Sequence, residues 1–191
     1  MNSMLEIKLD DIPNWSQVNK LCKELYRLYL KKRTLRSLRN YLLISLLAKT
    51  GVRLGELLGI KKEDVNIKSK TIIINQLKKR RKAVREIVIP PSLIPELSTY
   101  VRHIRGEKLF KMSERNARRI IYYYTEKILG RRFRPHAFRH TYALRILEKT
   151  KNLELVRRIL GHSRYDVLKA YLNYTVRDKK EEIIAAIESE V

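Results

Sequence analysis

The chain has 191 residues, enough to bury one hydrophobic core. It holds 43 Lys and Arg against 20 Asp and Glu, a formal charge of +23, which implies a polyanionic partner such as nucleic acid or an acidic membrane surface. Residues 1–11 mix acids and bases without an apolar run, and the most apolar stretch, Tyr41–Ala48, is too short to span a bilayer. A secretory signal and a membrane span are therefore not expected, and nucleic acid is the expected partner.

The cysteine count and the charge distribution narrow this further. Cys22 is the only cysteine, so neither an intrachain disulfide nor a cysteine-based zinc site is expected. We therefore expect an intracellular protein, in the cytoplasm or nucleoid, or in a host cell if the source is viral. Residues 178–191 hold five acids against two lysines, whereas residues 131–145 hold five arginines and no acid. The positive charge is thus concentrated before the last fourteen residues.

Apolar spacing and end signals predict a helical protein that contains one short β-meander. The predicted helices, in chain order, are Trp15–Lys31, Thr34–Thr50, Leu54–Ile60, Ser92–Arg105, Ser113–Leu129, His136–Lys149, Leu153–Leu160, Tyr165–Asn173 and Arg177–Glu190. The predicted strands are Val65–Ile67, Thr71–Leu77 and Val84–Ile89, which are β-branched runs separated by basic turns. Pro90 and Pro91 end the last strand.

These elements predict a single α+β domain, mainly helical with a small three-stranded antiparallel sheet. No internal repeat, low-complexity segment or linker divides the chain. Residues 1–32 are expected to form only a leading helix, and residues 177–191 a C-terminal tail helix. The tail has Ile183, Ile184 and Ile187 on one face, which must be buried against some other surface.

The first of four notable motifs is Thr-Gly-Val-Arg-Leu-Gly-Glu-Leu-Leu at residues 50–58. Arg53 stands between two glycines at a helix junction, where its guanidinium can point away from the core, and Glu56 three residues later can hold it. When this segment is taken alone, a helix-capping turn with a surface arginine is the favoured interpretation.

Three further motifs follow: Pro-His-Ala-Phe-Arg-His-Thr at 135–141, Leu-Gly-His-Ser at 160–163 and Lys-Ala-Tyr-Leu-Asn-Tyr at 169–174. The i, i+3 spacing places His136 and Arg139 on one face of the first turn of a helix. Tyr171 comes nine residues after His162. In this order and spacing, the four motifs resemble the active-site boxes of the tyrosine recombinases, the phage-integrase family. The resemblance covers about residues 34–175.

The resemblance implies a metal-independent DNA strand transferase that needs no cofactor, with double-stranded DNA as its substrate. The Tyr171 hydroxyl would attack a backbone phosphodiester, release the 5′-hydroxyl and hold the strand as a 3′-phosphotyrosine. Arg53, Arg139 and His162 would stabilise the charge on the non-bridging oxygens. His136 would accept the proton of the tyrosine, whose ordinary pKa of about 10 makes it a poor nucleophile at neutral pH. His140 would be a packing residue behind Arg139.

A lysine of the β-hairpin would protonate the leaving oxygen, and two candidates remain. We centre the hairpin on Arg80–Arg81, with Lys79 just before the turn and Lys82 just after it. The usual position of this lysine in the family favours Lys79, whereas its usual distance from the following proline favours Lys82. We prefer Lys79.

Several alternatives were weighed against these assignments. His136 and His140 have a zinc-ligand spacing, but the segment lacks a glutamate base and a third ligand, so a metal site is not expected. Tyr174 is the rival nucleophile, and the spacing from His162 favours Tyr171. A non-catalytic DNA-binding module would have lost a motif residue, and none is lost. A type IB topoisomerase shares the chemistry, but the Leu-Gly-His-Ser motif with its short spacing favours a recombinase.

The family usually has a helical DNA-clamping domain before the catalytic one, and residues 1–32 are too few to form it. We therefore expect this domain to be absent here. Segments after the tyrosine commonly dock on a neighbouring subunit in the family, so we also expect a homotetramer on DNA that is linked through the tail at residues 177–191. The alternative is that the tail folds back on its own domain.

Overall fold

The computed structural model describes residues 11–78, 81–160 and 184. The helices and strands follow in the order α1 (Trp15–Lys32), α2 (Leu35–Thr50), α3 (Leu54–Gly59), β1 (Val65–Asn66), β2 (Thr71–Lys78), β3 (Arg81–Val88), α4 (Ile94–His103), α5 (Glu114–Leu129), α6 (Pro135–Thr150) and α7 (Leu153–Leu160). Short 3₁₀ turns, η2 (Lys62–Asp64) and η3 (Pro91–Leu93), precede β1 and α4. Within these ranges the fold class is the predicted one, mainly helical with a three-stranded antiparallel sheet in the order β1-β2-β3.

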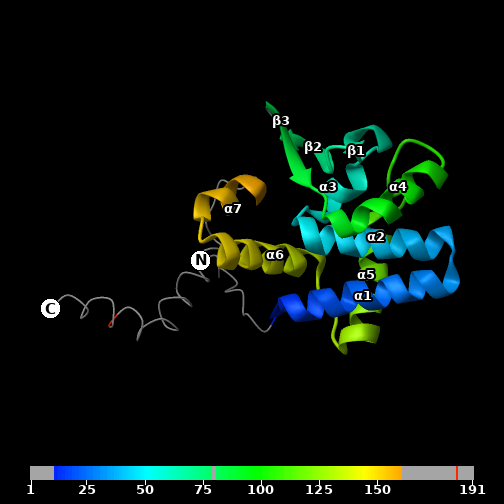
Figure 1. The fold of residues 1–191 in the computed structure, drawn as a ribbon, viewed down its shortest axis with the longest axis horizontal. Coiled ribbons are helices and arrows are strands. Elements are labelled where there is room, and N and C mark those ends of the chain that lie inside the picture. Colours follow the sequence, from blue (N-terminus) through cyan, green and yellow to red (C-terminus); the bar gives the residue numbers. More distant parts are fainter. Residues whose placement is uncertain (1–10, 79–80, 161–183, 185–191) are drawn as a thin grey trace.

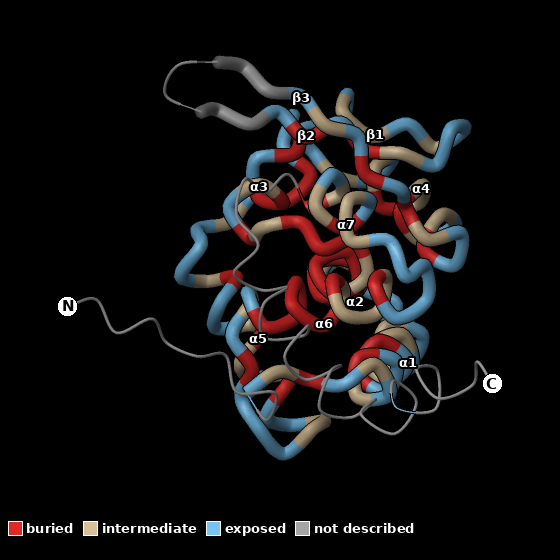
Figure 2. The backbone as a smooth tube through the Cα atoms, turned by 90° about the vertical axis from the view of Figure 1, so that its left-hand side faces the viewer, coloured by how far each residue is buried: buried red, intermediate tan, exposed pale blue. Residues whose placement is uncertain are grey.

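Helices α1 and α2 form an antiparallel hairpin at the centre of the fold (Figure 1). Each begins with a capping box, in which Asn14 accepts from the Gln17 amide and Thr34 accepts from the Ser37 amide. Helix α2 ends at Gly51, which adopts a left-handed conformation with φ 65°. Eleven of the sixteen α2 residues are buried, and Figure 2 shows buried backbone gathered around this helix at the centre of the fold. It packs against α1, α4 and α6 and so forms the axis of the core.

The sheet lies on the α2 side of this hairpin, away from α1 (Figure 1). Ile72 pairs with Ile87, and Ile74 pairs with Arg85. Side chains on one strand alternate between faces, and the isoleucines of these pairs are buried while Val84 and Val88 are exposed. Arg85 therefore occupies a position on the inward face of β3.

Helix α7 packs on the end of α6 and forms a core of its own. Ala143 and Leu147 of α6 contact Val156 and Leu160 of α7 in a cluster separate from the main core. Figure 1 shows α7 beside α6, on the side where the sheet lies.

The residues just before α1, and the first residue of α1, contact α6 and the segment that precedes α6. The Thr141 hydroxyl donates to the Pro13 carbonyl, Arg131 forms a 2.7 Å ion pair with Asp11, and the Arg145 guanidinium lies over the Trp15 ring. These contacts hold α1 against α6. Among the described helices, none combines the length and apolarity needed to cross a membrane.

The predicted elements are confirmed through residue 160, with three corrections. The first strand has only two residues, because its pairing with β2 ends at Asn66 and Ile67 belongs to the following turn. Residues 91–93 form a 3₁₀ turn, so the helix predicted from Ser92 begins at Ile94 and ends at His103.

The third correction concerns the hairpin. The last strand begins at Arg81 rather than at Val84, and the predicted centre on Arg80–Arg81 is wrong. Lys78 pairs with Arg81, so the centre lies one residue earlier. The helices predicted at 165–173 and 177–190 lie outside the described residues, apart from Ile184, which is exposed.

Candidate active site

The turn between α2 and α3 presents Arg53 at the surface of the core. Gly51 ends α2 in a left-handed conformation, and Arg53 precedes α3 as its N-cap residue with an extended backbone. The neighbouring Val52 and Leu54 are buried, and they anchor the turn on both sides of Arg53. The Arg53 side chain is 38% exposed, so it can reach a bound molecule.

Glu56 holds the Arg53 guanidinium in place. Its Oε1 accepts from Arg53 Nη1 at 2.8 Å, and its Oε2 accepts from the Arg53 backbone amide at 2.9 Å. The expected contact between these two residues is therefore present. Burial of Glu56 opposes its ionised form, but hydrogen bonds from Arg53 and the charge of Arg85 prevail and lower the pKa of this carboxyl.

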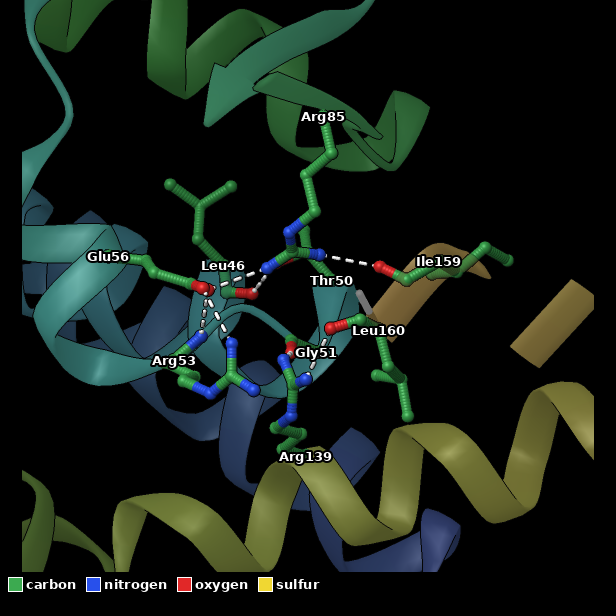
Figure 3. Close-up of polar contacts among 9 residues, drawn as sticks. All are labelled: Leu46, Thr50, Gly51, Arg53, Glu56, Arg85, Arg139, Ile159 and Leu160. Carbon is green, nitrogen blue, oxygen red and sulfur yellow. Dashed lines mark hydrogen bonds and ion pairs between the residues drawn. The ribbon is translucent and has the colours of Figure 1, made fainter. Parts of the chain in front are cut away.

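Arg85 is a third member of this group and is not among the site residues predicted from the sequence. Its Nη2 donates to Glu56 Oε2 at 2.6 Å, and its Nη1 donates to the Ile159 carbonyl at 2.5 Å (Figure 3). The sequence did indicate an inward position for Arg85. Alternate residues of a strand share a face, and Arg85 alternates with Ile87 and Ile89, which are buried. A basic residue on the inward face of a strand needs a partner, and Glu56 is that partner.

Arg139 lies on α6 and is 2% exposed. Its Nη1 donates to the Gly51 carbonyl, and its Nη2 donates to the Leu160 carbonyl at 2.5 Å (Figure 3). It thus joins the end of α2, the first half of α6 and the end of α7. Burial, with Arg53 and Arg85 nearby, lowers the pKa of Arg139 to about 9, so it remains charged at neutral pH.

His136 is one helical turn before Arg139 on α6 and is exposed. Its ring lies edge-on against the ring of His140, with the centroids 4.5 Å apart. Partial desolvation of the ring against its neighbours, followed by repulsion from Arg139 and Arg53, lowers the pKa of His136 below its ordinary 6.5. At neutral pH its imidazole is therefore uncharged and able to accept a proton.

A pocket of about 380 Å³ gathers three of the predicted residues, Arg53, His136 and Arg139. Arg118 and Tyr122 of α5 form part of its wall. The predicted residues come from two chain segments more than 80 residues apart, and the fold brings them to one cavity. No group of three or more His, Cys, Asp or Glu suited to a metal ion occurs within residues 11–78 and 81–160.

The remaining predicted residues lie beyond what can be described. Lys79, His162, Tyr171 and Tyr174 fall outside the described residues. Lys82 belongs to β3 and is opposite Leu77 in register, but the description does not extend to its side chain. The assignment of these residues to the site stays a prediction.

Comparison with known proteins identifies the family of the chain. The family model described as "Phage integrase family" matches residues 16–177. Tyrosine recombinase XerA of Pyrococcus furiosus is 27% identical over 157 residues, which are 76% of this chain and 54% of that protein. A tyrosine recombinase XerC-like protein of Caldanaerobacter subterraneus is 29% identical over 180 residues, which cover 72% of this chain and 46% of that protein. The chain thus spans about half the length of the curated relatives it matches.

Solved structures show the same fold. A crystal structure of XerA recombinase superposes with a TM-score of 0.69 at 23% identity, over 84% of this chain and 59% of that one. XerH site-specific recombinase, in a post-cleavage complex with its palindromic difH substrate, superposes with a TM-score of 0.72 at 20% identity, over 100% of this chain and 56% of that one. On the match across residues 16–177, the chain belongs to the phage integrase family of tyrosine recombinases and has the fold of their catalytic domain.

Proposed function

We propose that this chain cleaves and rejoins double-stranded DNA at specific sites through a 3′-phosphotyrosine intermediate. The observation that carries the proposal is the pocket that holds Arg53, His136 and Arg139 together. Two arginines and a neutral histidine at one cavity suit phosphoryl transfer, which needs charge stabilisation and a proton acceptor.

In the proposed reaction, the Tyr171 oxygen forms a bond to phosphorus as the bond to the 5′-oxygen breaks. His136 accepts the tyrosine proton, and a hairpin lysine, Lys79 or Lys82, protonates the leaving 5′-oxygen. Arg53, Arg139 and His162 bind the non-bridging oxygens, on which negative charge accumulates in the pentacoordinate transition state. The covalent bond conserves the energy of the phosphodiester, so attack by another 5′-hydroxyl rejoins the strands without ATP.

An arginine-lined groove on α5 supports DNA as the substrate. The groove has a volume of about 790 Å³, and its walls include Arg115, Arg118, Arg119 and Arg132 with Glu114 and Glu126, so positive charge is in excess there. Tyr122 and Arg118 line both this groove and the pocket around Arg53 and His136. We propose that the groove carries the phosphate backbone that runs toward the scissile phosphate, because guanidinium groups suit phosphate oxygens.

The test is incubation with a nicked suicide substrate, in which the cleaved fragment diffuses away and the covalent adduct accumulates. The expected result is a protein–DNA adduct on a denaturing gel, mapped by mass spectrometry to Tyr171. Tyr171→Phe should abolish the adduct without loss of DNA binding, and Tyr174→Phe is the matched control that should retain it. An adduct at Tyr174 would overturn the nucleophile assignment, and binding without any adduct would indicate a non-catalytic module.

The same purified protein can be used to distinguish recombination from DNA relaxation. Strand exchange between two duplexes supports a recombinase, whereas relaxation of any supercoiled plasmid without exchange supports a topoisomerase.

We further propose that the protein acts as a homotetramer on DNA, with the tail at residues 177–191 docked on a neighbouring subunit. Deletion of residues 178–191 should then preserve cleavage at a single site and impair assembly and exchange. Normal exchange by the truncated protein, together with a lower melting temperature, would place the tail in its own core.

A further inference from the structure

We propose that Arg85 is a positioning residue for the cleavage reaction, which offsets the charge of Glu56 and so leaves the positive charge of Arg53 available to the scissile phosphate. The inference rests on the proposed function and adds a residue to it. The group formed by Arg53, Glu56, Arg85 and Arg139 is called the arginine cluster below.

Arg85 is placed to act on the cluster without touching DNA. Unlike Arg53 and Arg139, it is not among the residues that line the pocket with His136, and both of its terminal nitrogens donate to protein oxygens, those of Glu56 and Ile159. Its Nε is buried without a hydrogen-bond partner among the described residues. Arg53, in contrast, is 38% exposed and lines the pocket. The two arginines thus share one carboxylate, and Arg53 is the one that can reach a ligand.

Stability alone does not explain a cation at this position. Arg85 stands opposite Ile74 on the buried face of the sheet, where an apolar side chain would avoid the cost of desolvating a charge. A buried ion pair is weak support for a stabilising role, because desolvation of both groups offsets their attraction. The arrangement of charges around Glu56 offers a better reason.

The charge of the cluster matches the reaction. Three guanidinium groups and one carboxylate leave two positive charges in excess. A phosphodiester carries one negative charge, and the pentacoordinate transition state carries two. Without Arg85, Glu56 would neutralise Arg53 and the excess would fall to one. Arg85 therefore favours the transition state over the ground state, which is the requirement for a faster chemical step.

The test uses the full chain and compares Arg85→Met with the double variant Arg85→Met/Glu56→Gln. The single variant lowers the excess charge to one, whereas the double variant restores it to two. Glutamine can still accept from Arg53 through its side-chain oxygen, so the position of Arg53 is kept. The measurements are the single-turnover rate of adduct formation at saturating DNA and the Kd for DNA.

We expect Arg85→Met to slow cleavage by about 30-fold, less than the loss of a group that contacts the phosphate directly, with a Kd within about threefold of wild type. The double variant should recover at least about fivefold of this rate, because removing the carboxylate removes the charge that Arg85 offsets. Arg85→Lys, which keeps the charge and loses one hydrogen bond, should be intermediate. If Arg85 only stabilised the fold, the double variant would not recover the cleavage rate.

Wild-type cleavage by Arg85→Met, or a double variant as slow as the single one, would overturn the inference. If Arg85→Met does not fold, the double variant decides alone: a rate within about tenfold of wild type supports the inference and an inactive folded protein overturns it. Arg145→Met is the control, because Arg145 lies on α6, pairs with Glu148 and is absent from the pocket. If wild type itself forms no adduct, the proposed function fails, a result distinct from either outcome for Arg85.

Discussion

Arg139 donates a 2.5 Å hydrogen bond to the carbonyl oxygen of Leu160, the last residue of α7. One residue earlier, the Ile159 carbonyl accepts from Arg85. Carbonyls at the C-terminus of a helix have no partner within the helix and carry the negative end of its dipole. Two guanidinium groups from different elements therefore fix the end of α7, directly before the Gly-His-Ser sequence at 161–163. Arg139 thus has two roles: it holds the ends of α2 and α7 together, and it is one of the residues proposed to bind the phosphate.

Arg139→Met should reduce the free energy of unfolding by about 3 kcal/mol, since it leaves two buried carbonyls with fewer donors. Chemical denaturation of both proteins measures this difference. Arg145→Met, which removes a partly exposed arginine from the same helix, should cost no more than about 1 kcal/mol. Equal stabilities for the Arg139 variant and wild type would show that the carbonyl contacts contribute nothing.

Gly51→Ala should be strongly destabilising, by about 3 kcal/mol, because two costs combine. Gly51 has φ 65°, and a Cβ there would collide with the Tyr142 ring and approach Leu160 Cδ2 at 3.1 Å. Gly130→Ala is the matched control, since Gly130 has φ 73° but no atom within 4 Å of the added Cβ. It should lose only the conformational part, about 1 kcal/mol. Similar melting temperatures for the two variants would exclude the steric cost at Gly51.

Cleavage should persist under mildly acidic conditions. The pKa of His136 is lowered from 6.5, so the imidazole stays neutral, and able to accept the tyrosine proton, down to a pH below that value. The acidic limb of the pH–rate profile should therefore have its midpoint below pH 6.5. His136→Asn should remove this limb while slowing the reaction. A midpoint above 6.5 that follows His136 would contradict the direction of the shift.

The same shift affects stability with a definite sign. The folded state binds a proton at His136 less readily than the unfolded state does, so the contribution to stability is complete above pH 6.5. It is lost as the pH falls from 6.5 toward the lower pKa of the folded state. Denaturation of wild type and His136→Asn across this window should show a smaller decline for the variant.

Cleavage should be insensitive to chelation. In the proposed mechanism, arginines supply the positive charge that divalent ions provide in many phosphoryl-transfer enzymes. Adduct formation after dialysis against excess EDTA should match the untreated rate. Loss of cleavage that magnesium or zinc restores would require a metal in the mechanism.

Binding to DNA should depend steeply on salt, and the groove on α5 should account for part of that dependence. Arg115→Ala and Arg119→Ala should each reduce the slope of log K against log salt by about 0.9, the value for one phosphate contact. Arg27→Ala is the control, because Arg27 lies on α1, is exposed and pairs with Glu24. An equal reduction in the control would mean that net charge, rather than the groove, determines binding.

The sequence was sufficient for the elements whose apolar pattern is strong. Helix α2, buried on nearly all sides, and α7 begin and end within one residue of the predicted positions. The association of Arg53 with His136 and Arg139 came from the resemblance to a family, since nothing in local spacing relates a turn after α2 to a helix that begins at Pro135. The centre of the hairpin could not be located from local sequence, because it depends on which residues of β2 and β3 pair.

Arg85 shows where local inference ends. The alternation of buried residues along β3 indicates that Arg85 faces inward. Its partners could not be identified in the same way, because Glu56 and Ile159 lie 29 and 74 residues away along the chain. Only the tertiary structure brings them together. A charged residue within a buried alternation is thus a sequence feature that calls for a search for its counter-charge.

The separate cluster beneath α7 has a consequence for local unfolding. Because Val156 and Leu160 pack on α6 rather than on the main core, α7 can detach while the α1–α2 hairpin stays folded. Native-state hydrogen exchange should then reveal α7 as a cooperative unit that opens at a lower free energy than α2. Each opening would withdraw the carbonyls of Ile159 and Leu160 from the two arginines that bind them. DNA that occupies the pocket would favour the closed form, so amide protection of α7 would rise with DNA concentration.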